Sequence, residues 1–323
     1  MENNVNRTDL SALKESVEKV KSEIRKIIVG QDKTVELLLA AIFADGHVLI
    51  EGVPGIAKTL IAKILAKTIS ADFSRIQFTP DLMPSDILGT SVYNMKNSEF
   101  EFKRGPIFSN IILIDEINRS PAKTQAALFE VMEERQVTMD GKTYKMEKPF
   151  IVFATQNPIE HEGTYKLPEA QLDRFLFKIE MDYPSLEEEI KILLEFNERK
   201  SFNDLNVLQE VFTKENLEAF KMQIRSIHIE ERIAAYIANI VYQTRTTGDL
   251  YLGASPRASI AIMIGAKALA AIRGRDYVIP DDVKEIAFPA LRHRVILTPE
   301  KEMEGKNTDE IIQLILNRVE VPR

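Results

Sequence analysis

The sequence contains no cysteine, no tryptophan and only four histidines. The lack of cysteine excludes disulfides, thiolate zinc sites, iron–sulfur clusters and thiol nucleophiles, so a metal could be held only by oxygen ligands or by histidine. The histidines lie far apart in the chain and lack the spacing of metal ligands. We therefore expect each of them to be an ordinary packed or solvated side chain; they are His47, His161, His228 and His293.

Long apolar runs are also missing. No stretch approaches the roughly 20 consecutive apolar residues of a membrane helix, and residues 1–9 are polar, without the apolar segment of a signal peptide. We expect a cytoplasmic protein without a membrane span. The formal net charge of −7 argues against a surface that neutralises many phosphates, so nucleic acid is not the expected partner, although a local basic groove could exist.

The order of apolar runs predicts the fold class. Short runs bounded by polar or turn residues indicate buried strands, and helical patterns separate most of them. These runs lie at 47–50, 75–78, 111–114, 150–154 and 175–181. Their alternation with helices predicts a mostly parallel five-stranded sheet covered on both faces. Strand signals stop after Tyr183-Pro184, so we expect an α/β domain over 1–184 and an all-helical domain over 185–323.

Three further segments have clear local patterns. Residues 10–27 carry one apolar stripe at helical spacing, which predicts a helix that packs on the core. Residues 93–102 contain a polar turn between alternating flanks. Residues 136–146 have Asp140-Gly141 at their centre, and this pair readily supplies the positive φ angles of a tight hairpin turn. We expect two hairpins that interrupt the alternation of strand and helix.

A glycine-containing loop follows the strand at 47–50 and opens a helix, which is the setting of a phosphate-binding loop. Its backbone N–H groups would face phosphate oxygens, Lys58 would contact the β- and γ-phosphates, and the Thr59 hydroxyl would ligate Mg²⁺. The loop comprises Gly52, Val53, Pro54, Gly55, Ile56, Ala57, Lys58, Thr59 and Leu60. From this segment alone, an ordinary strand-to-helix turn remains open.

Ala57 departs from the strict pattern Gly-x-x-x-x-Gly-Lys-Ser/Thr, because it stands where the last glycine belongs. Alanine adopts a helical φ without strain but resists a positive φ. We therefore expect a working loop to hold position 57 in the right-handed region.

Two carboxylates, Asp115 and Glu116, follow the buried strand at 111–114. Parallel strands point their carboxyl ends to the same edge of a sheet, so Asp115 should emerge beside the loop. Asp115 can hold Mg²⁺, and Glu116 is placed to polarise the water that attacks the γ-phosphate. Asn157 follows the strand at 150–154 and could bond that phosphate or the water, although Asn-Pro can also simply open a turn. Alone, the acidic pair would indicate solvated strand-end charges; with the loop it indicates ATP hydrolysis.

These segments together resemble the MoxR family of AAA+ ATPases. The resemblance covers nearly the whole chain, and its segments are 52–59, 115–125, 154–158 and 172–175. It implies a P-loop NTPase core with a helical lid, ATP and Mg²⁺ as cofactors, and a homo-oligomeric ring, expected to be hexameric. The implied function is chaperone-like remodelling or activation of a partner protein, which in this family often carries a von Willebrand factor A domain.

The resemblance also implies roles for single residues. Asn157 matches the first sensor, Arg174 resembles the arginine finger that reaches the neighbouring subunit's ATP, and Arg257 resembles the second sensor carried by the lid. The segment that resembles the lining of the adenine pocket is Ile28, Val29, Gly30 and Gln31. The two hairpins take the places of inserts that face the pore or upper surface of related rings. Whether they contact a client or are inert loops stays open.

Three other functions compete with this interpretation. Similar ATPase cores drive nucleic-acid motors and loaders, but the acidic charge and the lack of a Lys/Arg block with interleaved aromatics argue against that class. A metal-chelatase motor subunit would share the insertions and differ mainly in its partner. A small-molecule kinase would leave the helical domain and Arg174 without a role.

Overall fold

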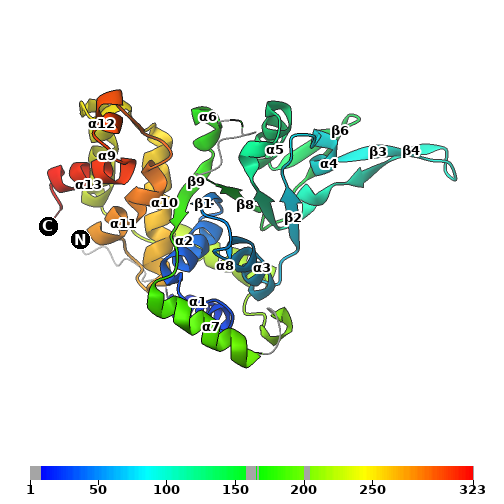
Figure 1. Ribbon diagram of the computed structural model, residues 1–323, viewed down its shortest axis with the longest axis horizontal. Coiled ribbons are helices and arrows are strands. Elements are labelled where there is room, and N and C mark those ends of the chain that lie inside the picture. The colour runs from blue at the N-terminus through cyan, green and yellow to red at the C-terminus, as the bar shows by residue number, and fades with distance from the viewer. Residues whose placement is uncertain (1–8, 158–164, 166, 200–203, 323) are drawn as a thin grey trace, which may run out of the picture.

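The centre of the molecule is a five-stranded parallel sheet in the order β2-β5-β8-β1-β9. The computed structural model describes residues 9–157, 165, 167–199 and 204–322 (Figure 1). The sheet strands are β1 (His47–Gly52), β2 (Phe73–Gln77), β5 (Ile111–Asp115), β8 (Ile151–Gln156) and β9 (Phe175–Met181). This arrangement confirms the predicted α/β core with its five strands.

Burial explains why these segments form strands. Every residue of β5 and the first five residues of β8 are buried, as expected for central strands of a parallel sheet covered on both faces. The edge strand β9 instead alternates, with Phe175, Phe177, Ile179 and Met181 pointing inward. Neighbouring side chains of a strand point to opposite faces, so the sheet separates two apolar cores.

Helices cover both faces of the sheet. One core joins it to the first three helices and to the C-terminal helices, and the other joins it to α4 and α5. These helices are α1 (Ser11–Arg25), α2 (Asp32–Phe43), α3 (Lys58–Thr68), α4 (Pro84–Leu88), α5 (Ala122–Glu134) and the short α6 (Glu169–Leu172). Single 3₁₀ turns lie at Pro106–Phe108, Ile117–Arg119 and Leu205–Val207. The predicted N-terminal helix does pack on the core, because its apolar stripe is buried.

The C-terminal part is helical with one exception. Its helices are α7 (Leu186–Arg199), α8 (Lys214–Arg225), α9 (Glu231–Thr246), α10 (Pro256–Ile272), α11 (Pro280–Leu291), α12 (Pro299–Met303) and α13 (Thr308–Arg318). The prediction of helices alone was wrong for β10 (Leu250–Leu252) and β11 (Ile296–Leu297), which form a small antiparallel pair. Strands this short are below the length at which alternation can be recognised. None of the described helices is long and apolar enough to cross a membrane.

Close packing joins the C-terminal helices to the sheet. Helix α10 lies among α2, α9 and α11, and its Gly265 faces β9. A Cβ atom at Gly265 would lie 2.6 Å from the ring of Phe177, so only glycine lets α10 approach the sheet this closely.

Both predicted hairpins are present, and they lie beside each other at the right of Figure 1. They are β3 (Gly89–Asn94) with β4 (Glu99–Arg104), and β6 (Gln136–Met139) with β7 (Lys142–Lys145). Asp140 and Gly141 have φ angles of 52° and 74°, which confirms the predicted tight turn. The rings of Phe102 and Tyr144 are 4.6 Å apart, and Ser91 donates a hydrogen bond to the Asp140 carboxylate. The two hairpins therefore pack against each other.

Candidate active site

The loop, the acidic pair and Asn157 meet at one edge of the sheet. Strand β8 lies between β1 and β5, and the register sets Ile50 opposite Thr155 and Ile114 opposite Ala154. All three strands are parallel, so the segments that follow them leave the sheet on the same side. The sequence separates these groups widely, and the fold brings them together.

The loop enters α3 through a left-handed residue. Ala57 caps α3 with φ 64° and ψ 19°, and Gly55 in the loop has φ 88°. The expectation of a right-handed Ala57 was therefore wrong. The chain must reverse here so that the N–H groups of the helix start face the loop, and position 57 takes the positive φ that glycine supplies in the strict pattern. For alanine this conformation costs about 1–2 kcal/mol.

We expect Ala57→Gly to raise the free energy of unfolding by about 0.5–1 kcal/mol, because the relief of strain exceeds the added freedom of the unfolded chain. Urea unfolding would measure the change. The matched control is Ala62→Gly in the buried interior of the same helix, which should lower stability by about 1 kcal/mol. Equal destabilisation by both variants would contradict the assigned strain.

Lys58 is the first residue of α3, and its Nζ donates to the carbonyl oxygen of Gly52, 2.6 Å away. The ammonium group is thus held over the loop itself. Space lies open above Gly55, where no atom would come within 4 Å of an added Cβ. The loop therefore combines a positive charge, backbone donors and room for an anion.

The acidic pair is held by partners that sequence reasoning missed. Asp115 is 8% exposed; its Oδ2 accepts from Arg75 Nε at 2.6 Å and its Oδ1 accepts from Thr155 Oγ1 at 3.1 Å. Glu116 has φ 58°, and its Oε2 accepts from Gln77 Nε2 at 2.9 Å and lies 2.9 Å from Arg119 Nε. These contacts fix the direction of both carboxylates. Arg75 and Gln77 alternate on β2, the strand beside β5, but only the strand register assigns them to these two acids.

The donor set suits a hard cation. Within the described ranges no group of three or more His, Cys, Asp and Glu side chains could hold a metal. Mg²⁺ commonly uses only one or two protein oxygens together with phosphate oxygens and water. The Thr59 hydroxyl and the Asp115 carboxylate, at the same sheet edge, are such a pair.

Two adjoining cavities extend from the loop. The first, about 260 Å³, is lined by Gly52 and Val53, and the second, about 480 Å³, by Gln31 and by Phe288 of α11. They share Glu180, Asp182 and Tyr183. Tyr183, which sequence reasoning did not single out as a site residue, therefore lines both the cavity at the loop and the cavity at Gln31.

In the segment expected to line the adenine pocket, one residue lies in the core and another lines the larger cavity. Ile28 is buried in the core, and Val29 and Gly30 are partly buried. Gln31 has φ 62°, donates through Nε2 to the Asp182 carbonyl at 3.2 Å, and lines the larger cavity. Of the four residues, Gln31 is the one that the structure places at this cavity.

Arg174 and Arg257 lie at the opposite edge of the sheet. Arg174 directly precedes β9, whose first residue pairs with His47 at the start of β1. Both arginines approach Glu133, at 4.0 Å and 3.3 Å, and line one cavity of about 290 Å³. The length of β1, roughly 17 Å at 3.3 Å per residue, separates this edge from the loop. The structure therefore brings the two arginines together and places neither beside Lys58.

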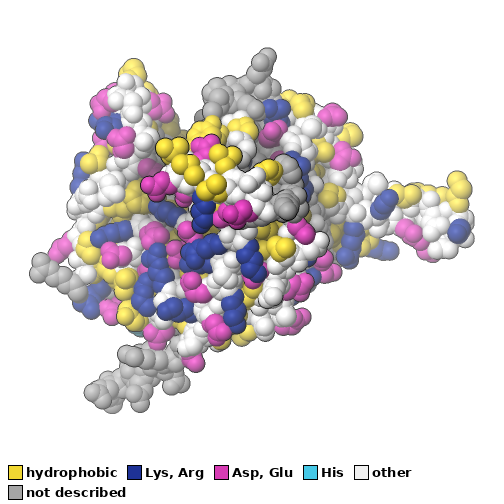
Figure 2. Space-filling view, turned by 60° about the horizontal axis from the view of Figure 1, so that its bottom comes forward, with side chains coloured by type: hydrophobic (Ala, Val, Ile, Leu, Met, Phe, Trp, Pro, Cys, Tyr) yellow, Lys and Arg dark blue, Asp and Glu magenta, His cyan; other side chains and the backbone are white. Residues whose placement is uncertain are grey.

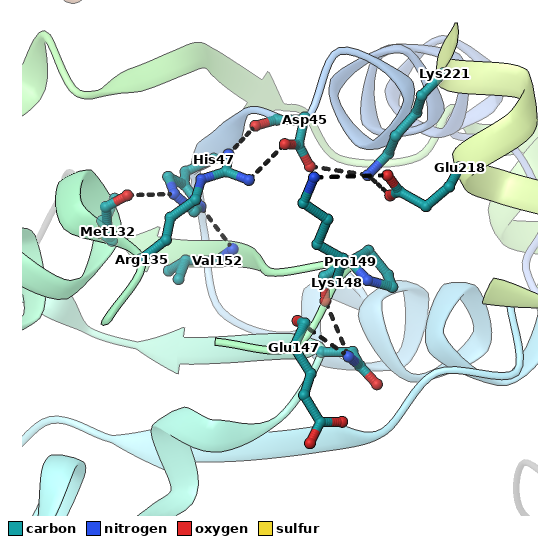
Figure 3. Close-up of polar contacts among 11 residues, drawn as sticks. Asp45, His47, Met132, Arg135, Glu147, Lys148, Pro149, Val152, Glu218 and Lys221 are labelled. Carbon is teal, nitrogen blue, oxygen red and sulfur yellow. Dashed lines mark hydrogen bonds and ion pairs between the residues drawn. The ribbon is translucent and has the colours of Figure 1, made fainter. Parts of the chain in front are cut away.

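A buried ion network next to that cavity connects α8 to the core (Figure 3). Asp45 accepts from Arg135 and, at 2.8 Å, from Lys221, which is 2% exposed and also bonds Glu218 at 2.9 Å. Burial raises the pKa of Asp45, but Lys221 and Arg135 outweigh it and leave the pKa below its ordinary value. This network is a structural link between the helical part and the sheet.

Two of the histidines are packed side chains, as predicted. Burial, with help from Arg135, lowers the pKa of His47 to about 4; its Nδ1 accepts from Val152 N–H, and its Nε2 faces the Met132 carbonyl. Burial likewise brings the pKa of His293 well below its ordinary value, and its Nε2 bonds the Phe175 carbonyl. Both are neutral at pH 7. His161 lies outside the described residues.

Comparison with known proteins extends these observations. The family described as "ATPase family associated with various cellular activities (AAA)" matches residues 47–177, and the AAA lid domain matches 242–315. The chain is 48% identical to the uncharacterized protein YeaC of Bacillus subtilis, over 94% of each chain. It is 44% identical to Chaperone MoxR1 of Mycobacterium tuberculosis, over 97% of this chain and 84% of that one. A crystal structure of a candidate ATPase from Cytophaga hutchinsonii superposes with a TM-score of 0.89 at 44% identity, over 97% of each chain.

Proposed function

Since the chain belongs to the MoxR family of AAA+ ATPases, we propose that it couples Mg²⁺-dependent ATP hydrolysis to the remodelling or activation of a partner protein in the cytoplasm. The observation that carries the proposal is the meeting of the Lys58 loop with Asp115 and Glu116 at one sheet edge. A nucleoside triphosphate and its metal ion require two polar segments that converge in this way.

The residues at this edge have separate roles in the proposal. The loop from Gly52 to Leu60 holds the phosphates, with Lys58 on the β- and γ-oxygens. Thr59 and Asp115 hold Mg²⁺, which when bound neutralises charge that develops on the phosphates. Glu116 takes a proton from the attacking water, and Asn157 positions that water or the γ-phosphate.

The adjoining cavities extend the proposed site. The base would lie between Tyr183 and the turn at Gln31, with Ile28, Val29 and Gly30 behind it, and α11 would close the far side through Phe288. We place the division of the chain near Pro184, with a nucleotide-binding domain over 1–184 and a lid over 185–323. The two family matches, 47–177 and 242–315, lie on either side of that point.

The position of the arginines supports a homo-oligomeric ring, which we propose to be hexameric. Arg174 and Arg257 lie a strand's length from the loop of their own chain, so each needs the nucleotide of a second copy. A guanidinium supplied in trans stabilises charge in the transition state and makes hydrolysis depend on subunit contact.

The hairpins are the proposed contact with the client. Tyr93, Met95 and Phe100 on the projecting β3–β4 hairpin are 48%, 87% and 70% exposed, and exposed apolar side chains are typical of surfaces that bind protein. A client with a von Willebrand factor A domain fits this scheme. We do not propose a nucleic-acid motor or a chelatase subunit, since a relative that matches 97% of the chain is named a chaperone.

Lys58→Ala tests the proposal directly. Loss of a charge-assisted contact of about 1.5–3 kcal/mol should weaken ATP binding roughly 10- to 150-fold. Titration with a fluorescent ATP analogue measures the affinity. Lys63→Ala is the matched control, because Lys63 is an exposed lysine of the same helix and should leave binding unchanged. If Lys58→Ala binds ATP with wild-type affinity, the assignment of this loop as the phosphate-binding loop is refuted.

A further inference from the structure

Helix α7 carries apolar side chains that the rest of the chain leaves exposed. Leu186, Ile190, Ile192, Leu193, Leu194 and Phe196 are between 39% and 74% exposed. Figure 2 shows hydrophobic side chains gathered along this helix together with acidic ones. Soluble monomers seldom leave a contiguous apolar surface of this kind in water, and when they do it commonly binds another protein.

The helix begins at the nucleotide edge of the sheet. It follows Tyr183, which lines both cavities of the candidate site, and Ser185 and Glu188 form a capping box at its start. A Cβ atom at Gly30 would lie 2.3 Å from Glu188 Oε1. Because Gly30 directly precedes Gln31, the first turn of α7 packs against the turn at Gln31. Whatever covers α7 therefore comes close to the bound nucleotide.

The size of the helix supports that conclusion. A helix of 14 residues is about 21 Å long and about 10 Å wide. A stable protein contact buries about 800 Å² on each partner, which exceeds the face of one such helix. A partner on α7 must therefore also cover surface beside the helix, and beside its first turn that surface is the nucleotide edge.

Charge indicates what that partner presents. By sequence, α7 carries Glu187, Glu188, Glu189, Glu195 and Glu198 against two cations, Lys191 and Arg199. At the opposite edge of the sheet, Arg174 and Arg257 share one carboxylate, Glu133. Ile260 of α10 lines the same cavity as these arginines and is 52% exposed, and Tyr251 of β10, the strand that leads into α10, is 76% exposed. One surface is acidic and apolar, and the other is basic and apolar.

We propose that α7 of one copy of this chain is covered by the β10–α10 face of a second copy, defined by Tyr251, Arg257 and Ile260. The two surfaces lie at opposite edges of the sheet, so the contact is head-to-tail and can repeat into a closed ring. The same contact carries Arg174 and Arg257 of the second copy toward the nucleotide of the first. This inference rests on the proposed function and assigns its subunit contact to α7.

Cysteine cross-linking tests the contact cleanly, because the chain has no cysteine of its own. Leu193→Cys and Tyr251→Cys chains are mixed with ATP and treated with a short bis-maleimide. We expect a cross-linked dimer in the mixture and at most a tenth of that yield from either variant alone. Met95→Cys, at the exposed hairpin tip, replaces Leu193→Cys in the control mixture and should give no more than this background.

A charge variant gives a second readout. Leu193→Glu with Leu194→Glu should convert the assembly to monomers in sedimentation with ATP, while the affinity for a fluorescent ATP analogue changes less than about twofold. The inference is overturned by a wild-type chain that stays monomeric with ATP, by cross-links between Leu193→Cys chains alone, or by equal labelling of Leu193→Cys in monomer and assembly. That last result would leave α7 open for a client. Wild-type chain that fails to bind ATP would instead refute the proposed function.

Discussion

Glu116→Gln is expected to reduce ATP turnover by about 10²- to 10⁴-fold, the usual contribution of a positioned general base. ATP affinity should stay within about threefold of the wild type, because the phosphate loop is intact. Glutamine keeps the size of the side chain and can still bond Gln77, but it cannot take a proton from water. Steady-state phosphate release gives the turnover, and equilibrium titration with a fluorescent analogue gives the affinity.

Glu215→Gln is the matched control for this change. Glu215 is an exposed glutamate of α8, next to Lys214, which pairs with Asp72 before the start of β2 and so away from the loop edge. Its variant should hydrolyse ATP at the wild-type rate. Two results would contradict the assignment of Glu116. One is turnover within threefold of the wild type, and the other is a loss of binding that equals the loss of turnover.

The sequence predicted those parts of the fold that have a strong local signal. The strands β5 and β8 are short continuous apolar runs because both of their faces are buried. The turn at Asp140-Gly141 was predicted from residue type alone. The strands β10 and β11, of three and two residues, have no such signal. They exist because tertiary packing brings two short segments side by side.

Position 57 shows where residue preference gives the wrong answer. Alanine favours a right-handed φ, but the entry into α3 requires a left-handed residue. The surrounding loop therefore holds Ala57 in the left-handed conformation. Gln31 and Glu116, near the same edge of the sheet as the loop, are also left-handed, as are five other non-glycine residues elsewhere in the described part of the chain. Strained residues of this kind persist where packing holds them, and they cluster at functional sites.

The partners of the acidic pair could not be predicted from motifs. Arg75, Gln77 and Thr155 are single polar residues on strands, and only the register of β2, β5 and β8 brings them to Asp115 and Glu116. The meeting of Arg174 with Arg257 likewise depends on how α10 packs beside β9. Motifs locate groups along the chain, whereas the contacts between them depend on packing.

Arg174 has two kinds of contact, and its substitution must separate them. It approaches Glu133 at 4.0 Å, and its Nη1 donates to the Phe129 carbonyl at the end of the sheet remote from the loop. A purely structural role would lower the melting temperature of the variant and disturb its own fold. A role in trans would leave the fold and ATP binding intact and remove turnover.

Arg174→Ala is expected to reduce turnover by about 10³- to 10⁵-fold, the effect of removing an arginine finger, with ATP affinity and melting temperature near wild type. Arg232→Ala, an exposed arginine of α9, is the control. Mixing Arg174→Ala with Glu116→Gln then decides between cis and trans action. In a head-to-tail ring, a chain with an intact Glu116 can receive the intact Arg174 of its neighbour, so roughly a quarter of the sites should recover. An inactive mixture would place the action of Arg174 within its own chain.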